Sequence, residues 1–201
     1  MKLILASKSP RRREILSMLG LHPEFLTLET AEDFDRSSVT PEELVMGLAC
    51  RKVRAANAYR RETTGTNEES DLLLAADTVV SLDGNVLEKP VDEDDARRMR
   101  HALSGRKHEV FTGIAAIHGS NIAVDVQKTD VYFRPLSDTD IDRYVASGEP
   151  MDKAGAYGAQ KKGCLLIEKI DGDFFNVVGL PVTRVDDMLK SAFGIGLTDL
   201  E

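Results

Sequence analysis

Short apolar runs of strand character alternate along the chain with stretches in which apolar residues recur at helical spacing. Residues 2–6 form such a run, and Ile15, Leu16 and Leu19 then follow one another at the period of a helix. Further alternation of this kind continues to the C-terminal part of the sequence. The pattern predicts an α/β domain.

Capping signals place the first two helices. Ser9 is a good N-cap before Pro10, and Gly20 stands where a helix C-terminus needs a left-handed residue. Thr40 to Glu43 has the sequence of a capping box, which predicts a second helix from there to about Tyr59.

The remaining elements follow from the same two periods. Asp83-Gly84 predicts a tight hairpin turn, and a glycine-rich loop is expected over 148–163. Strands are predicted over 71–82, 109–117, 122–133, 164–170 and 175–178, and helices over 92–105, 137–146 and 182–193. No internal repeat or linker interrupts them, so a single domain over 1–201 is expected.

Composition excludes several classes of protein. The hydrophobic and charged fractions of 42% and 30% are those of an ordinary soluble protein, and no apolar run reaches membrane-spanning length. A formal net charge of -8 argues against a nucleic-acid binder with a broad basic surface. Cys50 and Cys164 have no metal-ligand spacing and are expected to be buried free thiols in a reducing compartment. A cytoplasmic enzyme or binding protein, with no membrane or nucleic-acid partner, fits best.

Three consecutive arginines, Arg11, Arg12 and Arg13, occupy the first turn of the first predicted helix. The helix dipole already places positive charge there, so each cation costs a few tenths of a kcal/mol. The helix over 92–105 has the opposite, favourable order, with acidic residues first and arginines later. An anionic ligand at the start of the first helix would offset the cost.

Other cations extend this basic set. Lys52 shares a helix face with apolar residues, and Lys89 precedes Pro90, which makes its backbone extended. Lys153, Lys161 and Lys162 are possible additions. The alternative for each is a solvated surface charge. Neither GxxxxGK[ST] nor GxGxxG occurs, so a phosphate site would be of another kind.

Asp77 interrupts an apolar strand, where packing alone would favour an apolar residue. A buried carboxylate must pair with a cation or metal, or accept backbone hydrogen bonds at the strand end, and the first reading is favoured. Glu32 and Asp33 lie in an acidic stretch that would help to hold a divalent metal, although such stretches are usually only hydrated. His108 has no evident nucleophile partner, and GxSxG and HExxH are absent. The set favours charge neutralisation on a polyphosphate with a carboxylate activating water.

These motifs together resemble the Maf family of nucleoside triphosphate pyrophosphatases over nearly the whole chain. The matching stretches are SKSPRR, LACRK, AADTVV, LEKP, LSGRKHEVFTG, EPMDKAGAYGAQ and NVVGLP, in the same order. The resemblance implies an elongated α/β fold with a mixed twisted sheet, flanking helices and a deep central cleft, usually in a homodimer.

The resemblance also implies the chemistry and its residues. The family hydrolyses nucleoside triphosphates to the monophosphate and pyrophosphate with a divalent cation, Mg or Mn. Asp77 matches the general base and, with Asp33, a metal-binding position. The substrate-binding positions are matched by Ser7, Ser9, Arg11, Arg12, Lys52, Thr78, Lys89 and Gln160.

Substrate preference follows from three of these positions. Arg11, Thr78 and Gln160 match the branch that acts on dTTP, UTP and some modified pyrimidine nucleotides, rather than the branch that acts on 7-methyl-GTP. Two positions depart from the family: Asp33 replaces a common glutamate, and Lys161 stands where glycine is usual. The alternative function is a nucleotide-binding regulator of septum formation and cell division with little turnover.

Overall fold

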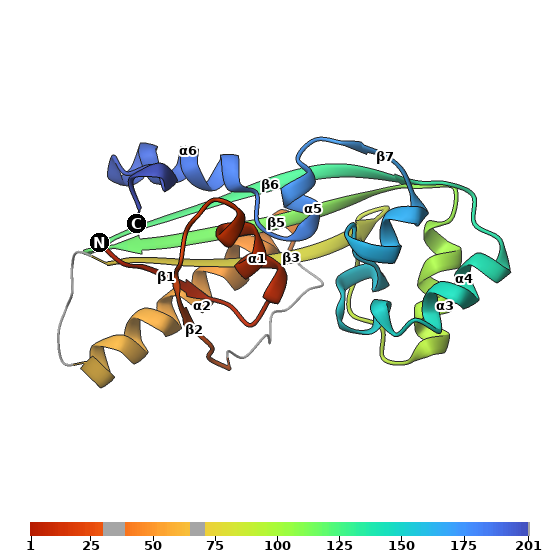
Figure 1. Cartoon of the computed structure of the whole chain (residues 1–201), viewed down its shortest axis with the longest axis horizontal. Coiled ribbons are helices and arrows are strands. Elements are labelled where there is room, and N and C mark those ends of the chain that lie inside the picture. Colours follow the sequence, from red (N-terminus) through yellow and green to blue (C-terminus); the bar gives the residue numbers. More distant parts are fainter. Residues whose placement is uncertain (30–38, 65–70, 201) are drawn as a thin grey trace. The chain divides into compact units, whose positions relative to one another are not determined.

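The computed structural model describes residues 1–29, 39–64 and 71–200. The chain divides into two compact units, which are described separately (Figure 1). Unit 1 comprises residues 1–77, 112–127 and 179–201, and unit 2 comprises residues 78–111 and 128–178. The secondary structure is a mixed seven-stranded sheet with flanking helices, so the predicted α/β class is confirmed. A single domain over 1–201 stays a prediction.

The strand order is β2-β1-β3-β5-β6-β7, and β4 pairs with β3. In unit 1, β1 runs parallel to both neighbours, with Ile4 opposite Glu24 on one side and Leu73 on the other. In unit 2, β3 with β4 and β6 with β7 form antiparallel pairs. The bounds are β1 Leu3–Ala6, β2 Glu24–Leu26, β3 Leu72–Leu82, β4 Asn85–Leu87, β5 Lys107–His118, β6 Asn121–Phe133 and β7 Ile167–Asp171.

The helices begin largely where the capping signals predict. Thr40 and Glu43 exchange the two hydrogen bonds of a capping box, and the helix continues about a turn beyond its predicted end at Tyr59. No described helix is long and apolar enough to cross a membrane. The helices are α1 Pro10–Met18, α2 Pro41–Thr64, α3 Glu93–Leu103, α4 Asp138–Val145, α5 Phe174–Val178 and α6 Val182–Phe193, with 3₁₀ turns η1 Glu149–Asp152, η2 Ala154–Ala156, η3 Lys161–Leu166 and η4 Leu197–Asp199.

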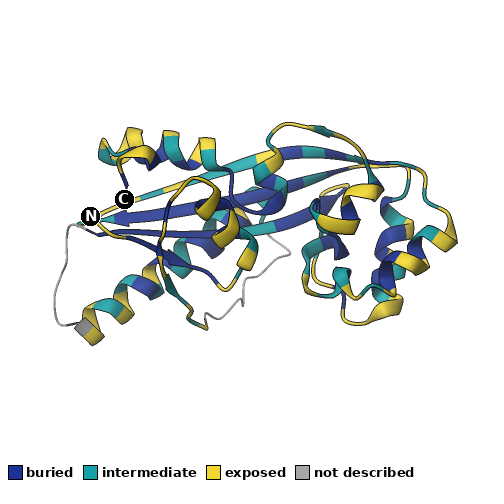
Figure 2. Ribbon diagram, in the orientation of Figure 1, coloured by how far each residue is buried: buried dark blue, intermediate teal, exposed yellow. Residues whose placement is uncertain are grey.

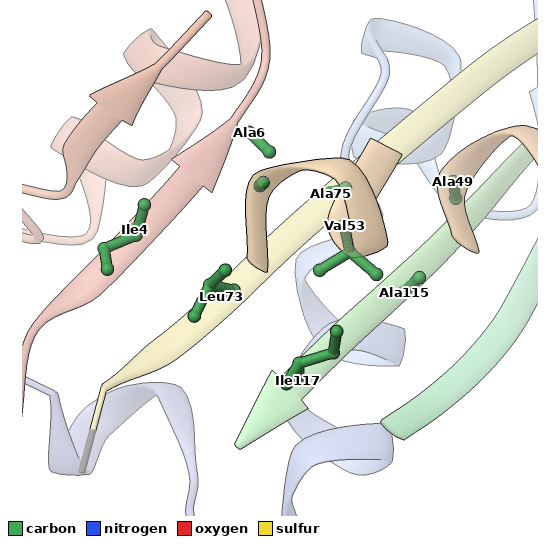
Figure 3. Close-up of a cluster of buried hydrophobic side chains, with 9 residues drawn as sticks. Ile4, Ala6, Ala49, Val53, Leu73, Ala75, Ala115 and Ile117 are labelled. Carbon is green, nitrogen blue, oxygen red and sulfur yellow. The ribbon is translucent and has the colours of Figure 1, made fainter. Parts of the chain in front are cut away.

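In unit 1, one face of α2 packs on strands β1, β3 and β5 (Figure 3). Ala49 and Val53 of the helix are fully buried against strand residues that include Ile4 and Ala115. Helix and strand approach closely at Gly113 of β5, where an added Cβ would lie 2.3 Å from the carbonyl of Val45. Only glycine allows this approach, which brings the α2 backbone directly onto the sheet.

In unit 2, a second core forms between the hairpin strands and the segments that follow α3 and α4. Its aromatic members Phe133, Tyr144 and Tyr157 pack with aliphatic residues such as Val110 and Leu103. The predicted hairpin turn is confirmed, since Asp83 and Gly84 both have positive φ between β3 and β4. Figure 2 shows that many of the buried residues lie on the strands, whereas the exposed residues lie mainly on helices and loops.

Two expectations about local structure are wrong, and one strand was not predicted. The strand predicted over 175–178 is helix α5, β2 has no predicted counterpart, and Cys164 is exposed in η3 rather than buried in a strand. Asp173 accepts a hydrogen bond from the Phe175 backbone N at 2.7 Å and so starts the short helix. A four-residue apolar run carries too little periodicity to separate helix from strand.

Candidate functional site

The turn between β1 and α1 is organised by one buried hydroxyl. Ser7 Oγ accepts hydrogen bonds from the Ser9 backbone N at 3.1 Å and from Arg12 Nη1 at 3.2 Å. Ser9 lies at the N-cap position of α1 in an extended conformation, but its side chain makes no capping bond there. The turn is therefore fixed by Ser7, and the first turn of the helix presents its amides beside two arginines.

Arg12 is the best-anchored cation of the basic set. Its side chain is only 9% exposed, and Nε donates to the carbonyl of Gly179 at 2.7 Å. Gly179 has a φ of +122°, a conformation that favours glycine. The backbone therefore favours glycine at the position whose carbonyl accepts the Arg12 hydrogen bond. Sequence reasoning noted NVVGLP only as a motif and missed this role of Gly179.

The three arginines have different environments. The Arg13 guanidinium lies 3.7 Å from the centre of the Phe25 ring, so it stacks on β2 as a cation–π pair. Arg11 is half-buried beside Arg12. Burial lowers the pKa of Arg12, the Asp77 carboxylate raises it, and the charge of Arg11 lowers it. Arg11, Arg12 and Asp77 thus share one electrostatic environment.

Asp77 lies in β3 and forms an ion pair with Lys52 of α2. Both side chains are largely withdrawn from solvent, with 15% and 21% of their surfaces exposed. Lys52 stands on the α2 face that packs on the sheet, four residues from buried Leu48 and Ala56. Its aliphatic stem follows that apolar face and its ammonium reaches the strand carboxylate.

Unit 2 contains the other three predicted substrate-binding residues. Thr78 directly follows Asp77 in β3 and, like Asp77, is half-buried. Lys89 is exposed after β4, and Gln160 is half-buried immediately before η3. Lys161, which follows Gln160, has a φ of +53°, a value that accounts for a glycine preference at this position.

The additional lysines of the predicted basic set are engaged in other ways. Lys153 Nζ donates to the Glu149 carbonyl at 2.5 Å and to Asp152 Oδ1 at 2.6 Å, and its side chain is 13% exposed. Lys161 and Lys162 are exposed. Lys153 therefore supports the fold of the 3₁₀ segment.

Asp77 can supply one carboxylate to a divalent cation that also binds a substrate. Asp33 lies outside the described residues, and within those ranges no three His, Cys, Asp or Glu side chains gather as a metal-binding group. Mg²⁺ commonly takes one or two protein carboxylates and completes its shell with phosphate oxygens and water. The Asp77 carboxylate fits that donor pattern.

His108 has a structural environment in unit 2. Its Nε2 is 2.7 Å from the Tyr157 hydroxyl, and the ring is buried between Phe133 and Tyr157. Burial, aided by the charge of Arg100, lowers the pKa of His108 from its ordinary 6.5 to about 3. The ring is neutral at physiological pH and is bonded to a tyrosine, which does not suit a role as a base for a nucleophile.

The chain belongs to the family of Maf-like proteins, whose model matches residues 2–192. It is 46% identical to the dTTP/UTP pyrophosphatase of Chromobacterium violaceum over 197 residues, covering 98% of this chain and 96% of that protein. The dTTP/UTP pyrophosphatase of Caldanaerobacter subterraneus subsp. tengcongensis is 45% identical, with coverages of 97% and 91%. A Bacillus cereus protein of the same name is 41% identical over 98% of each chain. The resemblance found in the sequence is confirmed.

Proposed function

We propose that this chain is a nucleoside triphosphate pyrophosphatase that hydrolyses dTTP and UTP, with modified pyrimidine nucleotides as further substrates. The observation that carries the proposal is the cluster in unit 1 formed by Arg12, Asp77 and Lys52 behind the first turn of α1. The names of relatives at 41–46% identity over nearly the full chain support the reaction and the bases.

The triphosphate is held by positive charge and by backbone amides. Arg12 is fixed by Ser7 and Gly179, so its charge is pre-oriented and loses little entropy when an anion binds. Arg11 adds charge, and Ser7 and Ser9 shape the turn before the helix N-terminus, where phosphate binding is favoured. Lys52 compensates charge on Asp77 and on the substrate.

Asp77 acts as the general base. A water molecule attacks the α-phosphorus, the bond from that phosphorus to the bridging oxygen breaks, and pyrophosphate leaves with the electron pair. The proton of the water passes to the Asp77 carboxylate. The products are the nucleoside monophosphate and pyrophosphate, and no covalent enzyme intermediate is needed.

A divalent cation, Mg or Mn, is proposed to bind with the triphosphate through Asp77 and Asp33. When bound, it supplies charge neutralisation on the phosphate oxygens. Asp33 has a shorter reach than the family's common glutamate, so its contact is expected to be weaker.

The contributions of unit 2 rest on the resemblance. Lys89 is proposed to contact phosphate, and Thr78 and Gln160 to contact the substrate, with Gln160 at the nucleobase. A homodimer and a cytoplasmic location are proposed on the same basis.

Pyrophosphate release from a panel of nucleoside triphosphates, with Mg²⁺ or Mn²⁺, tests this function directly. We expect dTTP and UTP to be hydrolysed with the highest kcat/KM. Tight nucleotide binding without pyrophosphate release would overturn the enzymatic reading and favour a nucleotide-binding regulator.

A further inference from the structure

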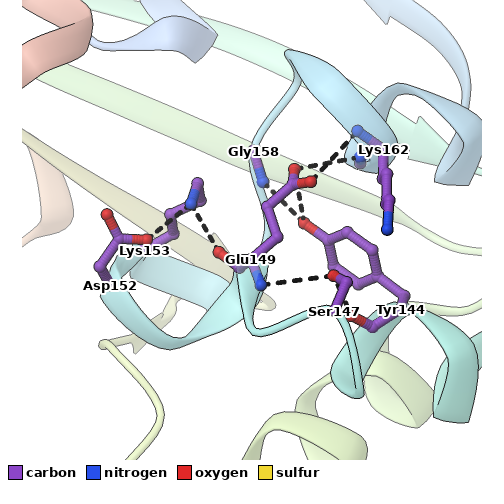
Figure 4. Close-up of polar contacts among 8 residues, drawn as sticks. Tyr144, Ser147, Glu149, Asp152, Lys153, Gly158 and Lys162 are labelled. Carbon is purple, nitrogen blue, oxygen red and sulfur yellow. Dashed lines mark hydrogen bonds and ion pairs between the residues drawn. The ribbon is translucent and has the colours of Figure 1, made fainter.

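A single carboxylate in unit 2 holds the segment that carries Gln160. Glu149 Oε2 accepts from the Lys162 backbone N at 3.1 Å, and Oε1 accepts from the Gly163 backbone N at 3.2 Å (Figure 4). The Tyr144 hydroxyl donates to the same Oε1 at 3.2 Å. Glu149 therefore fixes the C-terminal end of the Gly158–Gly163 segment, which we call the glutamine loop.

The other end of the glutamine loop is fixed by the same pair of residues. The Gly158 backbone N donates to the Tyr144 hydroxyl at 3.3 Å, so this hydroxyl joins Gly158 to Glu149. Burial raises the pKa of Tyr144, and the hydroxyl therefore keeps the proton that it donates. Both ends of the loop converge on one tyrosine–carboxylate pair.

Close packing reinforces this closure. An added Cβ on Gly163 would lie 1.9 Å from the Gly158 carbonyl oxygen, so the two ends of the loop are in direct backbone contact. The Lys153 side chain packs at Gly158, where an added Cβ would lie 2.9 Å from Cε. Between these anchors, Lys161 takes a positive φ that a lysine adopts only at a cost. The loop is held in one conformation at both ends.

The Glu149 carboxylate accepts hydrogen bonds from backbone N–H groups. Among the described residues its carboxylate has no ion-pair partner, because Lys153 Nζ bonds the Glu149 carbonyl and Asp152 instead. A carboxylate that accepts two backbone N–H bonds and a hydroxyl is a strong, directional clamp.

A fixed loop matters for base selection because a glutamine amide can present either its donor or its acceptor at a given position. Uracil and thymine present a donor at N3 and an acceptor at O4, and cytosine presents the reverse pattern at N3 and N4. A side-chain amide has both an acceptor and donors, and turning it by 180° exchanges them. Only an amide held in one orientation relative to the base separates the two patterns.

We propose that Glu149 is a positioning residue for pyrimidine selection, which fixes the glutamine loop so that the Gln160 amide pairs with thymine and uracil but not with cytosine. This inference rests on the proposed function and names the element that sets its base preference. It assigns no role to Glu149 in the chemical step.

The test compares wild type with Glu149→Ala, Glu149→Gln and Tyr144→Phe, and uses Glu168→Gln, an exposed carboxylate of β7, as the matched control. Binding of the non-hydrolysable α,β-methylene analogues of dTTP and dCTP is measured by calorimetry, together with binding of inorganic tripolyphosphate. Hydrogen exchange at the Gly158, Lys162 and Gly163 amides reports on the loop.

We expect the dTTP-to-dCTP affinity ratio to fall about tenfold in Glu149→Ala, because a mobile amide no longer rejects the reversed pattern. Glu149→Gln and Tyr144→Phe change the ratio in the same direction, with faster exchange at the loop amides. Tripolyphosphate has no base, so its affinity stays within about twofold of wild type, as does every measurement on Glu168→Gln.

An unchanged ratio in folded Glu149→Ala, or a loss of tripolyphosphate affinity equal to the loss for the dTTP analogue, would overturn the inference. A wild-type ratio near one would do the same. Because these are binding measurements, they give an answer even if wild type releases no pyrophosphate, which would overturn the proposed function alone.

Discussion

Among the residues that the structure describes, two arginines are buried, one in each unit, and their surroundings differ. Arg12 in unit 1 lies near the Asp77 carboxylate and donates to Ser7 and Gly179. Arg100 in unit 2 is fully buried among the rings of Phe133 and Tyr157, and it donates to the Gly155 carbonyl. Its Nε and Nη1 have no hydrogen-bond partner among the described residues.

The difference shows that burial of a cation does not by itself indicate a ligand site. Burial lowers the pKa of both guanidinium groups, and that of Arg100 falls to about 10. Only Arg12 has a carboxylate nearby that raises its pKa, and only Arg12 stands at the start of a helix beside a second arginine. A combination of opposite charges with a helix N-terminus marks the region for chemistry on an anion.

Removing the carboxylate base tests unit 1 most strongly. Asp77→Asn should lower kcat for dTTP by about 1000-fold or more, because the amide cannot take the proton from water. Nucleotide binding, measured by calorimetry, should persist. Asp171→Asn, which removes an exposed ion pair with Lys169, is the matched control and should retain full activity. A near-wild-type rate in Asp77→Asn would remove Asp77 from the role of base.

Arg12→Ala should lower kcat/KM by about 100-fold, because a fixed cation and its two anchoring contacts are lost together. Steady-state kinetics with dTTP measure the effect. Arg13→Ala is the matched control, since Arg13 stacks on Phe25, and it should change kcat/KM by about twofold at most. Equal effects of the two substitutions would show that Arg12 acts only through the general charge of the helix.

The neutral histidine of unit 2 should make stability depend on pH. Unfolded His108 binds a proton below pH 6.5, whereas in the folded protein burial lowers its pKa to about 3. Protons then favour the unfolded state, so stability falls by about 1.4 kcal/mol per pH unit between pH 6.5 and pH 3 from this group. Urea unfolding of His108→Gln between pH 4 and 7 should show a shallower slope than wild type. The control His22→Gln, at an exposed position, should keep the wild-type slope.

Arg100→Met should stabilise unit 2, by about 1–2 kcal/mol, because an apolar side chain replaces a desolvated charge with unsatisfied N–H groups. Urea unfolding at pH 7 measures the change, and activity on dTTP should be retained. Arg12→Met is the same substitution at the other buried arginine and should lower kcat/KM by about 100-fold, as Arg12→Ala does. A clear loss of stability in Arg100→Met would show that its contacts with Gly155 and the two rings outweigh its desolvation.

Sequence reasoning succeeded where a local signal decides the structure. The Thr40–Glu43 capping box, the Asp83-Gly84 turn and the alternation of strands and helices each depend on neighbouring residues. The apolar face that carries Lys52 and the lone acid in β3 were visible in the pattern, and the two side chains form an ion pair. Their roles in catalysis stay predictions.

Features set by distant residues could not be predicted. Helix α5 is held by the buried Asn176 amide, which donates to the Val110 carbonyl at 3.0 Å and to Thr129 Oγ1 at 2.9 Å. The Gly179 carbonyl meets Arg12 across 167 residues of sequence. A pattern of neighbouring residue types carries no information about such pairs.

Gly113 links the fold to the chemistry at a distance. Val45, whose carbonyl would meet any side chain placed at that position, precedes Lys52 by two turns of the same helix. A methyl group there would lift the helix from the strand and draw the lysine away from its acid, with no change to either partner. A mutational scan confined to residues near the phosphates would therefore miss Gly113, although this position affects how Lys52 is aligned with Asp77.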